Sequence, residues 1–241
     1  MNKIKISAVS YTNTKPFIYG IKHSSVLEKI ELSLDIPADC AKKLIENQVD
    51  IGLIPVAAIP FVPNARIISS YCIGSVGAVN SVFIFSDVSI QEVKTVKLDP
   101  QSRTSNNLAK VLLKNHFKVE VDFITDPSVE TDAIVLIGDR TFGRKADFKY
   151  AYDMGEEWMK FTGLPFMYAA WVANKSISEE FLKDFDEALG LGIQNIPTVI
   201  EELPVIEGID IEDYLLHKLN FNLTPEKLEA KDLFLKLIEE L

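Results

Sequence analysis

The sequence predicts a two-lobed α/β protein, in which mixed sheets are flanked by helices and two crossovers join the lobes. Short apolar runs alternate with stretches of helical spacing along the chain, which is typical of this fold class. The run at 50–56 is apolar after its first residue apart from a glycine, as expected of a parallel strand buried on both faces. Two further apolar extended stretches, 82–85 and 166–172, bracket the central section and are predicted to be the crossovers.

These crossovers set the predicted domain boundaries. Lobe one is assigned to residues 1–84 together with 173–241, and lobe two to residues 85–172. The chain has no low-complexity tract or flexible linker. Two crossovers without a linker imply a hinged cleft, so the ligand site is expected between the lobes.

Each element follows from its apolar pattern and its boundary residues. Apolar runs predict strands at 3–9, 30–36, 50–56, 67–73, 81–85, 93–98, 119–124, 133–137 and 166–173, with those at 119–124 and 133–137 buried. Helical spacing predicts helices at 38–47, 104–116, 178–195, 211–219 and 225–241. A helix also starts near Pro16, because Asn13 and Thr14 precede a proline suited to a first helical turn. Another starts after Asp153 and ends at Gly163.

The last helix is expected to bury one apolar stripe, made of Leu228, Phe234, Leu235, Ile238 and Leu241. Lys231 interrupts this stripe. It is therefore expected at the edge, with its stem packed and its amine in water.

Charge and hydropathy exclude several partners. The 25 basic and 35 acidic residues give a net charge of −10. The sequence has no basic stripe, so no nucleic-acid partner is expected. No window approaches the roughly 18 uninterrupted apolar residues of a membrane helix, so no membrane partner is expected either. Because the negative net charge of the protein repels an anion at long range, any anion-binding site must be built from hydrogen-bond donors close to the ligand.

The metal-ligating residue types lack ligand spacing. The two cysteines and three histidines lie far apart in the sequence, without an HExxH or CxxC pair: Cys40, Cys72, His23, His116 and His217. We therefore predict no metal site. The N-terminus has no charged segment followed by a long apolar stretch, which predicts a cytoplasmic protein without a secretory signal peptide.

Four polar clusters lie at the expected ends of strands: 10–16, 80–81, 102–105 and 138–140. Ligands of open α/β sheets bind at the carboxyl ends of strands, so one cleft can reach all four clusters. Their hydroxyls, amides and guanidinium groups suit a small polyanion. The clusters therefore indicate a binding site before they indicate catalysis.

Two clusters sit where helices begin. Asn13 either caps a helix, the more common outcome at such a position, or hydrogen-bonds a ligand. Ser102, Arg103, Thr104 and Ser105 also open a helix. One hydroxyl is enough for a cap, so three hydroxyls and an arginine predict a clamp for a carboxylate or phosphate.

The other two clusters are more ambiguous. Gly138, Asp139 and Arg140 form either a tight turn with an internal ion pair or part of the site. Asp139 is one of the few strand-end carboxylates that could act as a general base. Ser81 enters the first crossover, where its side chain would face the cleft. Without a plausible histidine partner it is a poor candidate for a nucleophile.

Together these segments resemble the chorismate dehydratase family of the futalosine route to menaquinone. The matching segments run in order over most of residues 1–175, at 9–16, 50–57, 102–105, 137–140 and 153–171. The last is the most specific, with Gly155-Glu156-Glu157-Trp158 and Thr162-Gly163-Leu164-Pro165-Phe166. The resemblance implies the fold of type II periplasmic binding proteins. It also implies a hydro-lyase that removes water from chorismate, a small dicarboxylate, to give 3-[(1-carboxyvinyl)oxy]benzoate without a metal or redox cofactor.

The resemblance also assigns roles. Asn13 and Ser81 map near the reacting ring, and the 102–105 loop holds a substrate carboxylate from the other lobe. We also expect Gly138 and Arg140 to bind the substrate. An asparagine cannot act as a base. We therefore hypothesise that the enolpyruvyl carboxylate of the substrate takes the C3 proton, while Asn13 and Ser81 hold it in reach. Asp139 is the rival base.

Two alternatives remain open on the sequence. The sister 1,4-dihydroxy-6-naphthoate synthase family is expected to carry a catalytic histidine in the second lobe, whereas His116 falls at a helix end. A non-enzymatic solute-binding protein for small anions is favoured by the fold alone. The missing signal peptide and the match at 155–171 oppose that alternative. The oligomeric state is not predicted.

Overall fold

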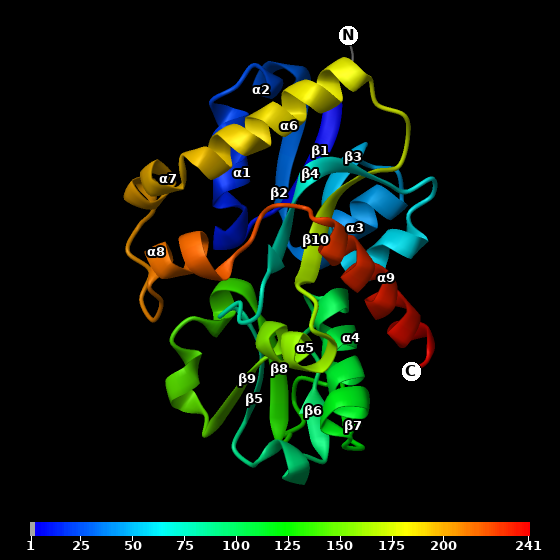
Figure 1. Ribbon diagram of the computed structural model, residues 1–241, viewed down its shortest axis with the longest axis vertical. Helices are drawn as coiled ribbons and strands as arrows, with labels where there is room; N and C mark the ends of the chain where they lie inside the picture. Colours follow the sequence, from blue (N-terminus) through cyan, green and yellow to red (C-terminus); the bar gives the residue numbers. More distant parts are fainter. Residues whose placement is uncertain (1–2) are drawn as a thin grey trace.

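The structure, a computed structural model that describes residues 3–241, contains two five-stranded sheets, one in each of two lobes (Figure 1). The strand order is β2-β1-β3-β10-β4 in lobe one and β7-β6-β8-β5-β9 in lobe two. In each sheet the fourth strand, β10 or β5, runs antiparallel to both neighbours, whereas the other pairs are parallel. Both sheets are therefore mixed, as predicted.

The sheet of lobe one is formed by β1 (Ile4–Val9), β2 (Ile30–Asp35), β3 (Ile51–Pro55), β4 (Arg66–Ser75) and β10 (Phe166–Ala173). Its two central strands, β3 and β10, are buried along their whole length. This explains why their sequences are apolar at every position, without alternation.

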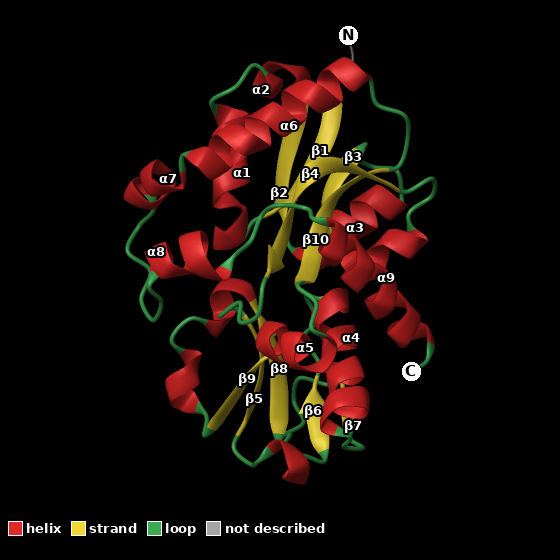
Figure 2. Ribbon diagram, viewed as in Figure 1, coloured by secondary structure: helices red, strands yellow, loops and turns green. Residues whose placement is uncertain are grey.

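Helices α1 (Lys15–Lys22), α2 (Val26–Lys29), α3 (Pro37–Ile45), α6 (Glu179–Gln194) and α9 (Pro225–Glu239) pack around this sheet (Figure 2). Helices α7 (Ile196–Glu202) and α8 (Ile211–Asp213) lie to one side, beyond α1 and α6. Helices α1 and α6 pack closely because glycines lie where they meet. A Cβ on Gly20 would lie 1.9 Å from the carbonyl oxygen of Ala188, and one on Gly192 would lie 1.8 Å from that of Pro16. Larger residues would force the helices apart.

The sheet of lobe two is formed by β5 (Val82–Ser86), β6 (Thr95–Lys97), β7 (Asp122–Ile124), β8 (Ala133–Ile137) and β9 (Tyr150–Asp153). Its helices are α4 (Arg103–Val111), which continues as a π-helical turn over Leu112–Phe117, and α5 (Met154–Thr162). Ser102 caps α4, and Asp153 caps α5 by accepting from the N–H groups of Gly155 and Glu156. Gly163 ends α5 with a positive φ of 74°.

Four elements differ from the sequence prediction, and the first is the short helix α2, which spans only four residues and was not predicted. The strand expected to be buried at 119–124 is only the short edge strand β7, half exposed because it pairs on one side. Strand β9 was not predicted, since four residues become a strand only through pairing with β5. Helix α7 was not predicted either, because Pro197 interrupts the helical pattern and begins a new helix.

The sheet pairing also differs from the predicted boundaries at 84/85 and 172/173. Residues 82–86 belong entirely to lobe two, and residues 166–173 belong to the sheet of lobe one. An apolar extended run is compatible with either a crossover or a buried strand, and long-range pairing decides between them. We propose that the crossovers are the shorter stretches at 76–81 and 163–165.

The buried face of α9 matches the predicted stripe only in part: Phe234 is buried and Ile238 packs against the core. Its buried residues are Lys227, Ala230 and Phe234, whereas Leu228 and Leu241 are exposed. The Lys231 side chain is largely covered, and its amine pairs with Asp232. The face of α9 that the pattern predicts to be wholly apolar therefore includes a buried lysine, Lys227.

Lys227 is fully buried and donates to three oxygens of one segment. Its Nζ lies 2.6 Å and 2.8 Å from the carbonyl and side-chain oxygens of Asn220, and 2.7 Å from the carbonyl of Asn222. Burial lowers the pKa of Lys227. The segment that it holds pairs with β4, since Asn220 N–H donates to Gly74 and Cys72 N–H donates to Phe221.

Replacing Lys227 with methionine is expected to destabilise the protein by about 2–4 kcal/mol, because buried oxygens lose their donor. The control is Lys231→Met, which changes the same helix at a position whose amine, among residues 3–241, bonds only to Asp232. Urea unfolding measures both variants. An equal loss of stability in the two variants would contradict the conclusion that the hydrogen bonds of Lys227 to Asn220 and Asn222 stabilise the protein.

Candidate active site

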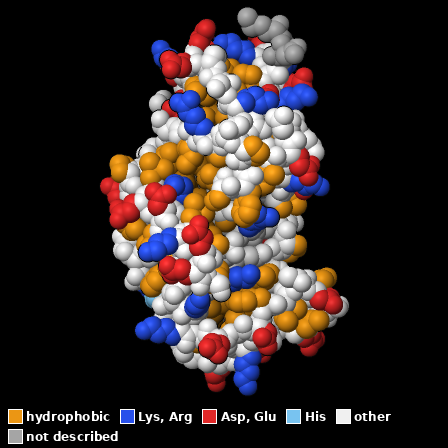
Figure 3. Space-filling model, turned by 90° about the vertical axis from the view of Figure 1, so that its right-hand side faces the viewer, with side chains coloured by type: hydrophobic (Ala, Val, Ile, Leu, Met, Phe, Trp, Pro, Cys, Tyr) orange, Lys and Arg blue, Asp and Glu red, His pale blue; other side chains and the backbone are white. Residues whose placement is uncertain are grey.

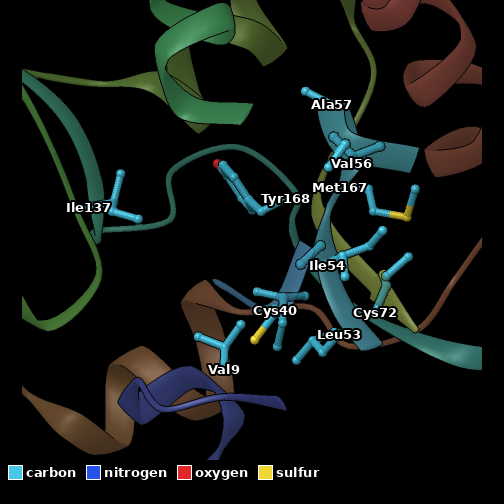
Figure 4. Close-up of a cluster of buried hydrophobic side chains, with 14 of the residues drawn as sticks. Val9, Cys40, Leu53, Ile54, Val56, Ala57, Cys72, Ile137, Met167 and Tyr168 are labelled. Carbon is cyan, nitrogen blue, oxygen red and sulfur yellow. The ribbon is translucent and has the colours of Figure 1, made fainter. Parts of the chain in front are cut away.

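A cavity of about 50 Å³ lies between the two lobes. Its polar lining comes from both lobes and consists of Tyr11, Asn13, Ser81, Ser102, Thr104, Ser105 and Tyr168. The remaining lining is apolar or glycine, and Figure 4 shows Val9, Ile137 and Tyr168 approaching it from different strands. Within residues 3–241, no charged side chain and no histidine lines the cavity.

The lobes are closed around this cavity by contacts that cross between them. The N–H of Ala57 in lobe one donates to Thr104 Oγ1 in lobe two at 3.0 Å. The Tyr11 hydroxyl donates to Gln101 Oε1. Space-filling shows the outline indented between the lobes, with neither sign of charge gathered on that face (Figure 3).

The hydroxyl residues Ser102, Thr104 and Ser105, predicted to clamp an anion, line the cavity at the start of α4. Ser102 Oγ accepts from the N–H of Ser105 at 3.1 Å and donates to Ser105 Oγ at 3.0 Å. All three hydroxyl residues of this turn are buried. The N-terminus of a helix carries partial positive charge, so the turn can hold an anion without a formal cation.

The two arginines of the predicted anion site do not line the cavity. The Arg103 guanidinium lies over the Phe61 ring, 4.7 Å from its centroid. Arg140 instead forms an ion pair with the buried Asp99, at 2.6 Å. The intramolecular pairing weighed for Arg140 therefore occurs, but with Asp99 rather than the adjacent Asp139.

Asp139 also lies outside the cavity lining and connects the lobes. Its carboxylate accepts from the Thr12 N–H, at 3.1 Å to each oxygen, and from Thr12 Oγ1 at 3.0 Å. Burial raises the pKa of Asp139, whereas the Thr12 hydrogen bonds and the Lys15 charge oppose this shift. In this conformation the Asp139 carboxylate of lobe two is hydrogen-bonded to Thr12 of lobe one, and we call this contact the Asp139 latch.

Asn13 and Ser81 face the cavity from opposite lobes. Asn13 lies inside a 3₁₀ turn, Thr12–Thr14, and does not cap α1. Its side-chain oxygen accepts from Thr14 Oγ1 at 3.0 Å. The capping interpretation of Asn13 is therefore wrong, and its amide interacts instead with the Tyr214 hydroxyl, which opposes the rise in the pKa of that phenol.

Sequence reasoning missed Tyr214. This buried residue follows α8 and donates from its hydroxyl to Ser81 Oγ at 2.9 Å. The C-terminal helices carry no local motif, so only the fold brings Tyr214 to the site. Tyr168 also lines the cavity, and its hydroxyl lies 3.3 Å from Ser75 Oγ.

Gly138 of lobe two lies close to the Tyr11 ring of lobe one at the cavity. Its φ is +61°, and a Cβ there would lie 2.6 Å from ring atoms of Tyr11. Its N–H donates to the Ser81 carbonyl at 2.7 Å. A glycine is therefore needed both for the backbone conformation and for closure.

The motif around Gly155 is explained by the first crossover. Asp153 accepts from the N–H groups of Val79, Asn80, Gly155 and Glu156, which fixes the crossover to the start of α5. A Cβ on Gly155 would lie 2.5 Å from the Tyr168 hydroxyl and 2.6 Å from the Gly77 carbonyl oxygen.

The histidine of the second lobe, His116, is not part of the cavity lining. His116 Nε2 pairs with Glu157 Oε2 at 2.9 Å, and neither residue lines the cavity. Among the described residues, no group of His, Cys, Asp and Glu side chains could hold a metal ion. No helix in the described part of the chain is long and apolar enough to cross a bilayer.

The Asp139 latch predicts a pH dependence of stability. With its pKa raised above 3.8, the folded protein keeps a proton that the unfolded chain has released, so stability falls as pH rises through this interval. Asp139→Asn should remove this slope in urea unfolding measured from about pH 3 upwards, a range that also extends below 3.8, where the lowered pKa of the control residue acts. The control is Asp132→Asn, because N–H donors lower the pKa of Asp132 and give a slope of opposite sign. An unchanged slope in Asp139→Asn would contradict the assignment.

Comparison with known proteins identifies related chains. A protein family described as menaquinone biosynthesis matches residues 4–240. A solved structure from Archaeoglobus fulgidus is 17% identical, with a TM-score of 0.75, covering 99% of this chain and 97% of that chain. A Candida albicans gene product described as having the generic periplasmic binding protein fold is 15% identical, with a TM-score of 0.69, covering 100% and 91%.

The aliphatic sulphonate binding protein of Escherichia coli, described as periplasmic, is 13% identical, with a TM-score of 0.57, covering 100% of this chain and 92% of that chain. At such identities the likeness concerns the fold alone. The fold is thus periplasmic-binding-protein-like, in agreement with the two mixed sheets and the double crossover.

Proposed function

The chain belongs to this menaquinone biosynthesis family, and on that premise we propose that it is a cytoplasmic chorismate dehydratase. The observation that supports this proposal most is the makeup of the interlobe cavity. It offers hydroxyl and amide groups from both lobes but no carboxylate, histidine or cation among the described residues. Such a site suits a substrate that supplies its own base.

Chorismate meets that condition. It carries two carboxylates, and the C3 hydrogen lies next to the carbon that bears the leaving hydroxyl. When the C3–H bond breaks, its electron pair forms the new ring double bond, the C4–O bond breaks and the ring becomes aromatic. The reaction is therefore made favourable by the aromatic ring that the substrate itself forms. The protein therefore needs mainly to fix the conformer, exclude water and assist proton transfer.

The residues divide between these tasks. We propose that Asn13 and Ser81 hold the enolpyruvyl carboxylate so that it takes the C3 proton. The hydroxyls at 102–105 and the N-terminus of α4 would hold the ring carboxylate from lobe two. Asp139 is disfavoured as the base because it is engaged by Thr12 outside the cavity.

Substrate entry requires the lobes to separate. A cavity of about 50 Å³ is too small for a ten-carbon diacid, so the cleft must open to admit chorismate and close to exclude water. The hydrogen bonds of Thr12 to Asp139 and of Ala57 to Thr104 would break and re-form in each cycle.

The test is incubation of the purified protein with chorismate, followed by ultraviolet absorbance and mass spectrometry. A product lighter than chorismate by one water is expected. Unchanged chorismate, with protein shown to be folded, would contradict the proposal. Thermal-shift screening of cyclic-futalosine-type compounds and small carboxylates would then separate a sister naphthoate synthase from a binding protein.

A further inference from the structure

Tyr214 is a buried tyrosine that joins the C-terminal part of lobe one to the cavity. Tyr214 is the first residue of a π-helical turn, Tyr214–Lys218, that directly follows α8. In Figure 1, α8 lies at the left, at the level where the two lobes meet. The Tyr214 side chain is 1% exposed, and its ring packs edge-on against Phe142 of lobe two at a centroid distance of 5.5 Å. Its hydroxyl donates to Ser81 Oγ.

This hydrogen bond constrains the direction of the Ser81 hydroxyl. A serine hydroxyl has one hydrogen and two lone pairs. Because Ser81 Oγ accepts from Tyr214, one lone pair is occupied and the Ser81 hydrogen must point elsewhere. Among residues 3–241, the Ser81 side chain has no other hydrogen-bond partner, and it lines the cavity. Its hydrogen is therefore available to a ligand there.

Resting on the proposed function, we propose that Tyr214 is a positioning residue for the elimination. By donating to Ser81 Oγ, it directs the Ser81 hydrogen toward the substrate carboxylate that takes the C3 proton. Tyr214 itself gives up no proton. The C3 proton passes to the substrate carboxylate, the C3–H pair forms the ring double bond, and the hydroxide leaving C4 takes that proton to become water.

The surroundings of Tyr214 keep it a donor. Burial raises the pKa of the phenol, the carboxylates of Asp139 and Asp153 raise it further, and interactions with Ser81 and Asn13 oppose the shift. Tyr214 also borders a second cavity of about 310 Å³, whose charged lining residues are Lys145, Asp210 and Asp213. The hydroxyl thus stays protonated at neutral pH.

The experiment compares Tyr214→Phe with Ser81→Ala and with the double variant. Tyr214→Phe keeps the ring packing and is expected to lower kcat about tenfold to a hundredfold, with KM nearly unchanged. In a Ser81→Ala background it should cause no further loss, because both substitutions remove the same interaction. The control is Tyr71→Phe, whose hydroxyl has no hydrogen-bond partner in the described chain and whose ring packs on Phe17.

The outcomes separate this inference from the function on which it rests. Wild-type protein without chorismate turnover would overturn both. An active wild type with an equally active Tyr214→Phe, or with additive losses in the double variant, overturns the inference alone. If Tyr214→Phe does not fold, a fluorinated tyrosine at position 214 decides: it keeps the hydroxyl but ionises at lower pH. Turnover should then fail at lower pH than in wild type, and an unchanged profile overturns the inference.

Discussion

Asn13→Ala is expected to lower kcat for chorismate at least about a hundredfold, because the substrate carboxylate loses a group that holds it beside C3. Asn13 lines the cavity, and its side-chain oxygen accepts a hydrogen bond from Thr14 Oγ1, its neighbour in the chain. The fold should therefore survive the change. Steady-state kinetics by ultraviolet absorbance, with thermal unfolding of the same samples, measures both effects.

Asp139→Asn is the decisive comparison for Asn13→Ala. If Asp139 is not the base, the variant should keep nearly full turnover, since an amide oxygen can still accept from Thr12. A general base would lose about 10²–10⁴-fold. A second comparison is Asn13→Asp, which keeps the shape but places a negative charge beside the substrate carboxylate, so it should be as impaired as Asn13→Ala. Loss in Asp139→Asn with activity retained in Asn13→Ala would reverse the assignment.

Gly138→Ala is expected to lower kcat/KM by about tenfold to a hundredfold, because it opposes closure of the lobes. The added Cβ would meet the Tyr11 ring at 2.6 Å, and an alanine at φ +61° is strained by about 1–2 kcal/mol. Tyr11 belongs to lobe one and Gly138 to lobe two, so the clash is relieved by opening the cleft. Small-angle X-ray scattering should show a larger radius of gyration than in wild type.

The chain offers a matched control for the backbone contribution. Gly163 has a φ of +74° at the end of α5, and a Cβ there would meet no atom within 4 Å. Gly163→Ala therefore carries backbone strain without the clash. It should lose about 1 kcal/mol of stability and keep its turnover. Equal turnover in the two variants would show that the approach of Gly138 to Tyr11 does not govern closure.

Much of the local structure could be predicted from the sequence, because apolar period and capping are properties of neighbouring residues. The start of α1 at Lys15 and Pro16, the Ser102 cap of α4 and the end of α5 at Gly163 are confirmed. The mixed α/β fold class is confirmed by the two sheets. The hydroxyls at 102–105 lie at the cavity because a helix start after a strand faces the cleft.

The tertiary structure alone decided which side chains share the cavity. Arg103 and Arg140 are turned to Phe61 and Asp99, partners that no local pattern specifies. Asp139 meets Thr12, 127 residues away, and Tyr214 meets Ser81 across 133 residues.

The tertiary structure also decided to which sheet each strand belongs. Residues 166–173 have the composition of any buried extended run, and only their pairing with β3 and β4 places them in lobe one. Sequence alone determined the periodicity of the elements and the polar turns that follow them. The fold determined the contacts between distant segments, because a contact depends on two positions and on the packing between them, which neither position encodes by itself.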